Sequence, residues 1–175
     1  MVDPTALIEL ERRARAGEAW AFGQVVRHHE RDLRGLVWSV VRNGEHTDDV
    51  LQSAFEKAFR RIKTFQGDAP MKSWLQSICY RAALDHLRYE GRRRHLDLDA
   101  LASVASSDDV AHRVETLDHF DAVMASLDPE TRALLMLTAG HGHTLTEAAR
   151  ITGLPVGTVN SRLSRARRRL QMEAS

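Results

Sequence analysis

Residues 144–170, TLTEAARITGLPVGTVNSRLSRARRRL, decide the fold of the C-terminal part of this chain, because they predict two short helices that break at Gly153. Thr144 and Glu147 have the spacing of a capping box, so the first helix should begin at Thr144. Gly153 favours a stop with positive φ. Pro155 suits the first turn of the next helix, because it lacks an amide hydrogen and its φ is already near helical values.

The second predicted helix is amphipathic. Its apolar stripe consists of Val159, Leu163, Ala166 and Leu170, at spacings of four, three and four. Hydroxyls and guanidiniums lie on the other side, at Thr158, Ser161, Arg162, Arg165 and Arg169. A helix-turn-helix places such a helix in the major groove, where Arg contacts phosphates or guanine edges. An arginine face that is merely solvated remains the alternative for this stretch alone.

The residue order adds to this pattern. Pro155-Val156-Gly157-Thr158-Val159, followed by Ser161-Arg162-Leu163, Arg165-Ala166-Arg167 and Leu170, resembles the C-terminal promoter-recognition helix of extracytoplasmic-function sigma factors. The resemblance implies recognition of the minus-thirty-five promoter element by this helix. The residues implied for DNA contact are Thr158, Asn160, Ser161, Arg162, Ser164, Arg165, Arg168 and Arg169. Asn160 and Ser164, where relatives often carry larger or charged residues, should determine the promoter preference.

The composition bounds the class of protein. A length of 175 residues allows one ordinary domain or two small ones, and 43% hydrophobic with 28% charged residues is typical of a globular chain. The single Cys79 excludes an internal disulfide and fits a reducing compartment. No apolar run approaches the ~20 residues of a membrane span. The N-terminal residues also do not show the succession of basic, apolar and small-residue regions that a signal peptide has. We therefore expect a cytoplasmic chain without membrane insertion.

The small net charge of +1 conceals a segregation of charge. From His95 to Asp128, eight acidic residues oppose the single Arg113, so this segment carries −7 and the remainder carries +8. Two basic parts around an acidic middle suggest two modules that face nucleic acid and a connector with another task.

The N-terminal part predicts successive helices. Asp3-Pro4 should begin the first, which runs toward Gly17, and the second should run from about Glu18 to Arg42 and end at Asn43-Gly44. Thr47 or Asp48 should cap the third. The residues expected on the buried faces of the second and third helices include Trp20, Phe22, Val25, Leu33, Leu36, Val40, Val50, Leu51, Ala54, Phe55, Ala58, Phe59 and Ile62.

The start of the third helix, Asp48-Asp49-Val50-Leu51-Gln52 with Ala54-Phe55, resembles the segment by which sigma factors hold the clamp helices of the RNA polymerase β′ subunit. Without the resemblance, its polar residues would be a solvated face. The residues implied for polymerase contact are Asp48, Asp49, Gln52, Phe55 and Glu56. His46 and Ser53 depart from the family pattern, where an Asp and a Glu are common.

The loop 65–70 and the fourth helix, predicted from Met71 to about Arg94, resemble the sigma region that melts the minus-ten element. In that family the loop receives a base extruded from the non-template strand, and the basic helix follows the backbone. The residues implied for this contact are Phe65, Asp68, Met71, Lys72, Arg81, Arg88, Arg92 and Arg93. Arg81 stands where family members usually carry Asn. Trp74 is expected in the core, with a stacking platform as the alternative.

The segment 95–114 lacks a helical period, and its serines and aspartates predict a flexible linker. The resemblance implies that it threads through polymerase toward the RNA exit path. Helical periodicity resumes at Leu117, and Asp128-Pro129-Glu130 should begin a helix that closes at Gly140. His141-Gly142-His143 is expected to be a solvated loop, since no further metal ligand stands at the required spacing.

Three functions are compatible with these features: a sigma factor, a plain DNA-binding regulator with an N-terminal sensor or dimerisation domain, and a small helical enzyme with an incidental basic tail. Catalysis has little support, because the sequence has no phosphate-binding glycine loop and no nucleophile elbow. We expect no cofactor and no metal. Only a sigma factor needs both the DDVLQ segment and the stretch 65–94.

The resemblance covers nearly the whole chain and leaves no room for an appended sensor domain. It implies an all-α protein with two small helical domains: sigma region two at 1–94, a flexible acidic linker at 95–114 and a helix-turn-helix region four at 115–175. The implied partners are core RNA polymerase, through its β′ clamp helices and β flap, promoter DNA and an anti-sigma factor that wedges between the modules or wraps them.

Overall fold

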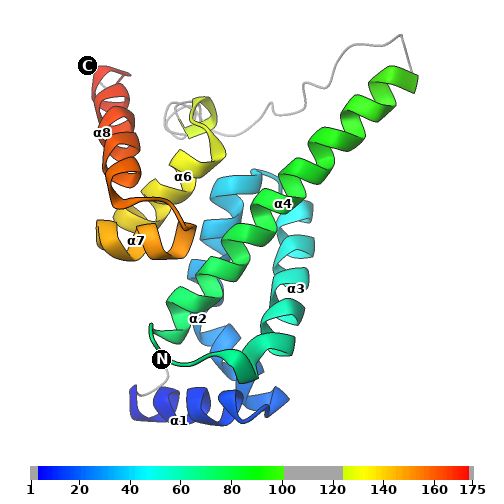
Figure 1. Ribbon diagram of the computed structural model, residues 1–175, viewed down its shortest axis with the longest axis vertical. Helices are drawn as coiled ribbons and strands as arrows, with labels where there is room; N and C mark the ends of the chain where they lie inside the picture. Colours follow the sequence, from blue (N-terminus) through cyan, green and yellow to red (C-terminus); the bar gives the residue numbers. More distant parts are fainter. Residues whose placement is uncertain (1–3, 101–123, 174–175) are drawn as a thin grey trace.

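The computed structural model describes residues 4–100 and 124–173, in which every regular element is helical (Figure 1). The N-terminal elements are α1 (Pro4–Arg15), α2 (Ala19–Val41), α3 (Gly44–Arg61), the 3-10 turn η1 (Ile62–Thr64) and α4 (Met71–Ala100). The C-terminal elements are α6 (Pro129–Leu135), the π-helical turn η2 (Met136–Gly140), α7 (Leu145–Thr152) and α8 (Val156–Glu173). The all-α prediction is confirmed. None of the described helices combines the length and apolar character that a bilayer crossing requires.

Helices α2, α3 and α4 form a bundle, and α1 lies across the lower end of α2 (Figure 1). The predicted stripes supply its core, with Val25, Leu36 and Leu75 fully buried. Two aromatic predictions are wrong. The side chain of Trp20 is 62% exposed, beneath the Arg13 guanidinium at 5.4 Å from the ring centre, and Phe59 is partly exposed beside Phe22. At 3.6 residues per turn, Trp20 lies on the face of α2 opposite its buried residues, and Phe59 lies beside the buried stripe of α3.

Two helix boundaries differ from the prediction. Helix α3 begins at Gly44, because the Asn43 side chain accepts a hydrogen bond from the His46 amide at 3.0 Å and caps the helix earlier than Thr47 or Asp48 would. Thr47 is buried, and its hydroxyl donates to the Asn43 carbonyl at 2.6 Å. Helix α4 extends to Ala100, past the position at which the linker was expected to begin. The expectations for residues 101–123 lie outside the described residues.

The C-terminal helices follow the local signals closely. The Asp128 side chain accepts from the Thr131 amide at 3.0 Å and caps α6, with Pro129 at its first position. Thr144 and Glu147 form the predicted capping box of α7. Gly153 ends that helix with a φ of 77°. Helix α8 then begins one residue after Pro155, whose carbonyl accepts from the Val159 amide at 3.0 Å. Helix α6 packs on α2, and α7 packs on both α4 and α8.

Candidate nucleic-acid and polymerase interfaces

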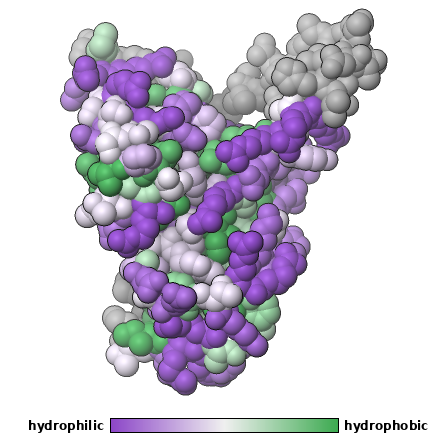
Figure 2. All heavy atoms as spheres, in the orientation of Figure 1, coloured by the Kyte–Doolittle hydropathy of each residue, from purple (hydrophilic) through white to green (hydrophobic). Residues whose placement is uncertain are grey.

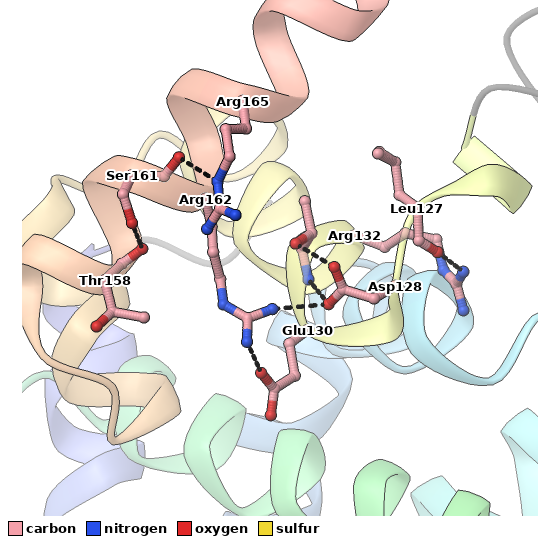
Figure 3. Close-up of polar contacts among 9 residues, drawn as sticks. Leu127, Asp128, Glu130, Arg132, Thr158, Ser161, Arg162 and Arg165 are labelled. Carbon is pink, nitrogen blue, oxygen red and sulfur yellow. Dashed lines mark hydrogen bonds and ion pairs between the residues drawn. The ribbon is translucent and has the colours of Figure 1, made fainter.

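The buried stripe of α8 orients its polar face outward. Val159, Leu163 and Ala166 are buried against the neighbouring helices, and Leu170 is partly buried. The predicted DNA-contacting residues divide into two groups. Asn160, Ser161, Arg165, Arg168 and Arg169 are exposed, whereas Thr158, Arg162 and Ser164 are half-buried. In Figure 3 the Arg165 side chain folds back along α8, where its Nε donates to the Ser161 carbonyl at 3.3 Å.

Arg162 is held by carboxylates of its own module. Its guanidinium forms ion pairs with Asp128 at 2.9 Å and with Glu130 at 2.8 Å (Figure 3). Burial acts to raise the pKa of Asp128, but hydrogen bonds from Thr131 and the charge of Arg162 outweigh burial and lower it. Arg162 therefore fixes the angle of α8 on α6. Sequence reasoning missed this pairing, because Asp128 and Glu130 were identified only as a helix start.

A cleft of about 340 Å³ lies where the loop 65–69 meets α4. Phe65 and Trp74 form one side as a tilted pair of rings, with centres 5.1 Å apart, and Trp74 is only partly buried. Arg81 lines the cleft and donates to the Ser77 carbonyl and hydroxyl, both at 3.2 Å. Two residues of α7, Arg150 and Ile151, complete the lining. The cleft therefore offers an aromatic surface, hydrogen-bond donors and positive charge.

The structure brings some of the predicted minus-ten residues together and separates others. Phe65, Asp68 and Arg81 share the cleft. Met71, in contrast, is 1% exposed and belongs to the core, so it is not available to a base in this arrangement. Lys72 forms an ion pair with Asp32 of α2 at 2.5 Å.

The remaining predicted minus-ten residues lie further along α4. Arg88 pairs with Asp85 at 3.1 Å, and Arg92 and Arg93 are exposed. Figure 2 shows hydrophilic residues along this edge of α4. The edge is therefore a polar, partly basic continuation of the cleft.

The predicted polymerase-contacting residues form an exposed polar face on α3. Asp48, Asp49, Gln52 and Glu56 are exposed, and Phe55 is half-buried against the core. Asp48 forms an ion pair with Arg34 of α2, which also lies 3.7 Å from Glu30. The acidic face is thus accessible, and an ion pair with Arg34 of α2 holds the Asp48 carboxylate.

The His141-Gly142-His143 prediction is wrong, since both histidines are half-buried rather than solvated. Gln76 of α4 lies between them, 3.1 Å from His141 and 2.8 Å from His143. Periodicity could not reveal this contact, because the partners are more than 60 positions apart. Among the described residues, no group of three or more His, Cys, Asp or Glu side chains could hold a metal ion.

Comparisons with known proteins agree with these features. Residues 25–93 match the family Sigma-70 region 2, and residues 117–170 match Sigma-70, region 4. The sequence is 36% identical to the ECF RNA polymerase sigma factor SigM of Mycobacterium tuberculosis over 155 residues, which cover 89% of this chain and 78% of SigM. It is 31% identical to the ECF sigma-E factor of Escherichia coli K12 over 170 residues, which cover 90% of this chain and 88% of sigma-E.

Two solved structures are also similar. The sigma factor RpoE of Bartonella quintana, solved with the anti-sigma factor NepR, superposes with a TM-score of 0.71 at 28% identity and covers 87% of this chain and 96% of that one. CnrH, solved with the cytosolic domain of CnrY, gives a TM-score of 0.67 at 29% identity, over 93% of both chains.

Proposed function

The chain belongs to the extracytoplasmic-function sigma factors of RNA polymerase, and from this premise we propose how its surfaces divide the work of promoter recognition. The observation that carries the proposal is the presence of two different nucleic-acid surfaces on one chain. One is the arginine face of a helix-turn-helix, and the other is an aromatic cleft at the start of a basic helix. A plain regulator needs only the first.

The exposed face of α3 binds the clamp helices of the polymerase β′ subunit in this proposal. Asp48, Asp49, Gln52 and Glu56 supply acceptors and negative charge, and Phe55 supplies an apolar edge. The C-terminal module contacts the β flap. Electrostatic complementarity of this kind speeds encounter and fixes the register of two proteins.

The cleft receives one extruded base of the minus-ten element. Phe65 and Trp74 provide a surface for stacking, which stabilises single-stranded bases by ~1–3 kcal/mol each. Arg81 donates to the edge of the base, while Arg88, Arg92 and Arg93 follow the phosphates along α4. Trp74 would then serve both the core and the cleft, since it is only partly buried.

Helix α8 recognises the minus-thirty-five element as duplex. Thr158, Asn160, Ser161, Ser164 and Arg165 are the proposed base contacts, and Arg168 and Arg169 the proposed phosphate contacts. Arg162 acts mainly by positioning α8, because Asp128 and Glu130 already hold it.

We also propose the domain bounds of this chain, its cellular location and the kind of protein that regulates it. Region two includes the whole of α4, to Ala100, region four includes residues 117–170, and the connector lies between them. The protein acts in the cytoplasm as a transcription initiation factor rather than an enzyme, and an anti-sigma factor controls it. The similar sigma factor RpoE, which was solved with the anti-sigma factor NepR, supports the last point.

The decisive experiment is run-off transcription with core RNA polymerase, the full chain and a promoter library. We expect the chain to co-elute with core polymerase and to select promoters at both elements. A chain that binds DNA but does not co-elute with core polymerase would instead be a plain regulator.

A further inference from the structure

Arg15, the last residue of α1, reaches the loop 65–69 that forms one side of the cleft. Its Nη2 donates to the Gln66 carbonyl at 3.1 Å, and its guanidinium lies over the Phe65 ring, 5.3 Å from the ring centre. Figure 1 shows α1 at the end of the bundle where this loop leads into α4. One side chain of α1 therefore contacts both an aromatic ring and the backbone of the loop.

Gly67 allows the guanidinium of Arg15 to lie close to the loop backbone. Its φ is 86°, in the left-handed region that glycine adopts most readily. A Cβ atom at this position would lie 3.1 Å from Arg15 Nη1 and 3.2 Å from Nη2, which is closer than ordinary van der Waals contact. Three successive residues of the loop, 65–67, thus pack against one arginine.

Arg15 lies behind the cleft and is not one of its lining residues. All three loop residues that it approaches, 65–67, belong to the lining. Within the cleft the neighbour of Phe65 is Trp74, with ring centres 5.1 Å apart, whereas the Arg15 guanidinium holds Phe65 from outside. A guanidinium over an aromatic ring is a favourable contact. Arg15 can therefore orient the stacking surface without touching a base.

The loop needs such support because it is exposed. Residues 66–68 are exposed, and only the turn before them is anchored in the core, where Ile62 of η1 is 1% exposed. Holding an exposed residue in one conformation costs backbone entropy. The ring contact and the hydrogen bond from Arg15 offset that cost before a base arrives, so that binding does not have to order the loop.

We propose that Arg15 is a positioning residue of the cleft, which keeps residues 65–67 in the arrangement that receives an extruded base. The inference rests on the proposed function, because it assigns a supporting residue to the same base site. The other role open to an exposed arginine beside single-stranded DNA is a phosphate contact. The two roles differ in their effect, because a positioning residue acts only on strands that insert a base, whereas a phosphate contact acts on all strands alike.

The test measures binding of the holoenzyme to two minus-ten single strands, one intact and one with an abasic site at the extruded position. Arg15→Ala should weaken binding of the intact strand about fivefold or more, as expected when the binding-competent loop is less populated. Its affinity for the abasic strand should stay unchanged. Arg15→Lys should not restore binding, because an ammonium lacks the planar fork that contacts ring and carbonyl together. Arg12→Ala is the matched control, since it removes another exposed arginine of α1, which pairs with Glu9 at 2.6 Å.

Gly67→Ala gives a second, independent measurement. In the wild-type background the added Cβ both strains the backbone and displaces the Arg15 guanidinium. In the Arg15→Ala background only the backbone strain remains. The loss of affinity for the intact strand should therefore be smaller in the double variant than the sum of the two single losses. Additive losses would mean that Arg15 and the loop act independently.

Two further results would overturn the positioning role. Equal losses on the intact and abasic strands, with recovery in Arg15→Lys, would assign a phosphate contact to Arg15. A loss of binding to core polymerase together with a lower melting temperature in Arg15→Ala would assign it a general structural role. If the wild-type holoenzyme binds the two strands equally, the base site of the proposed function fails. If the wild type prefers the intact strand and Arg15→Ala prefers it equally, only the positioning role is removed.

Discussion

The two nucleic-acid surfaces of this chain differ in how they are built. The face of α8 is formed within one module, by a buried stripe and by ion pairs from Arg162 to Asp128 and Glu130. The cleft beside Phe65 is shared, since Arg150 and Ile151 come from the other module. A surface built locally is complete in the free chain. A shared one depends on how the two modules dock, so a substitution in either module can alter it.

The largest expected effect is on the local surface. Leu163→Ala should destabilise the C-terminal module by ~2–5 kcal/mol, because it removes a fully buried side chain from the α8 stripe. Duplex minus-thirty-five binding should fall, while the α3 face should still bind core polymerase. Chemical denaturation and filter binding measure the two effects. Met172→Ala, on the exposed end of the same helix, should change neither.

Arg165→Ala tests whether α8 recognises bases. It should cost ~1–3 kcal/mol of affinity for the preferred sequence and relax specificity at one position. Arg168→Ala should instead weaken all sequences alike and reduce the slope of affinity against salt by about one. Binding to a set of minus-thirty-five variants separates the two patterns. Equal losses on every sequence for Arg165→Ala would contradict the base contact.

Arg81→Asn tests whether the cleft beside Phe65 prefers a particular base. A guanidinium carries only donors and favours the acceptor edge of guanine, with ~1–3 kcal/mol for a good pair. We expect the wild type to prefer guanine at the extruded position, and the variant to lose that preference while its stability stays unchanged. Holoenzyme binding to four strands that differ at this base provides the measurement. A wild type that binds all four equally would remove the role of Arg81.

Thr144→Ala should have a smaller effect of about 1 kcal/mol, because it removes the cap of α7. Thr146, exposed on the same helix, is not a cap, and Thr146→Ala is the matched control. Thermal denaturation distinguishes them. If both substitutions lowered the melting temperature equally, the capping box would have no special role in holding α7 against the cleft.

Acidification should open the shared surface gradually. Burial lowers the pKa of both His141 and His143 from 6.5; the nearby Asp32, for His141, and Glu147, for His143, oppose the shift, while Lys72 adds to it. Because both histidine pKa values are lowered while the modules are docked, the docked arrangement has its full stability above pH 6.5. It loses stability as the pH drops below that value. If His141 is protonated, the Gln76 amide can rotate so that its oxygen accepts from His141 and its nitrogen faces His143. It cannot accept from both rings once both are protonated. Scattering from pH 7.5 to 5.5 should show expansion in the wild type and none in His141→Ala/His143→Ala.

Sequence reasoning succeeded where the cause was local. The capping box at Thr144, the stop at Gly153, the cap at Asp128 and the stripe from Val159 to Leu170 all depend on residues within a few positions of each other. Contacts between modules could not be predicted. Gln76 is a polar residue that is fully buried, and its hydrogen-bond partners lie more than 60 positions away. For the same reason, Arg132 and the two histidines were identified only as parts of a helix and a loop.

Arg132 of α6 is buried and donates hydrogen bonds to the carbonyls of Ser39 and Val40 in the last turn of α2, and this contact affects how the chain melts. If either module unfolds, the hydrogen bonds from the Arg132 guanidinium to the carbonyls of Ser39 and Val40 are lost, and a hydrogen bond from a charged group contributes about 1.5 to 3 kcal/mol. Such a penalty couples the unfolding of the two halves. The free chain should therefore show one calorimetric transition whose van't Hoff and calorimetric enthalpies agree, whereas the chain bound to polymerase should lose that cooperativity.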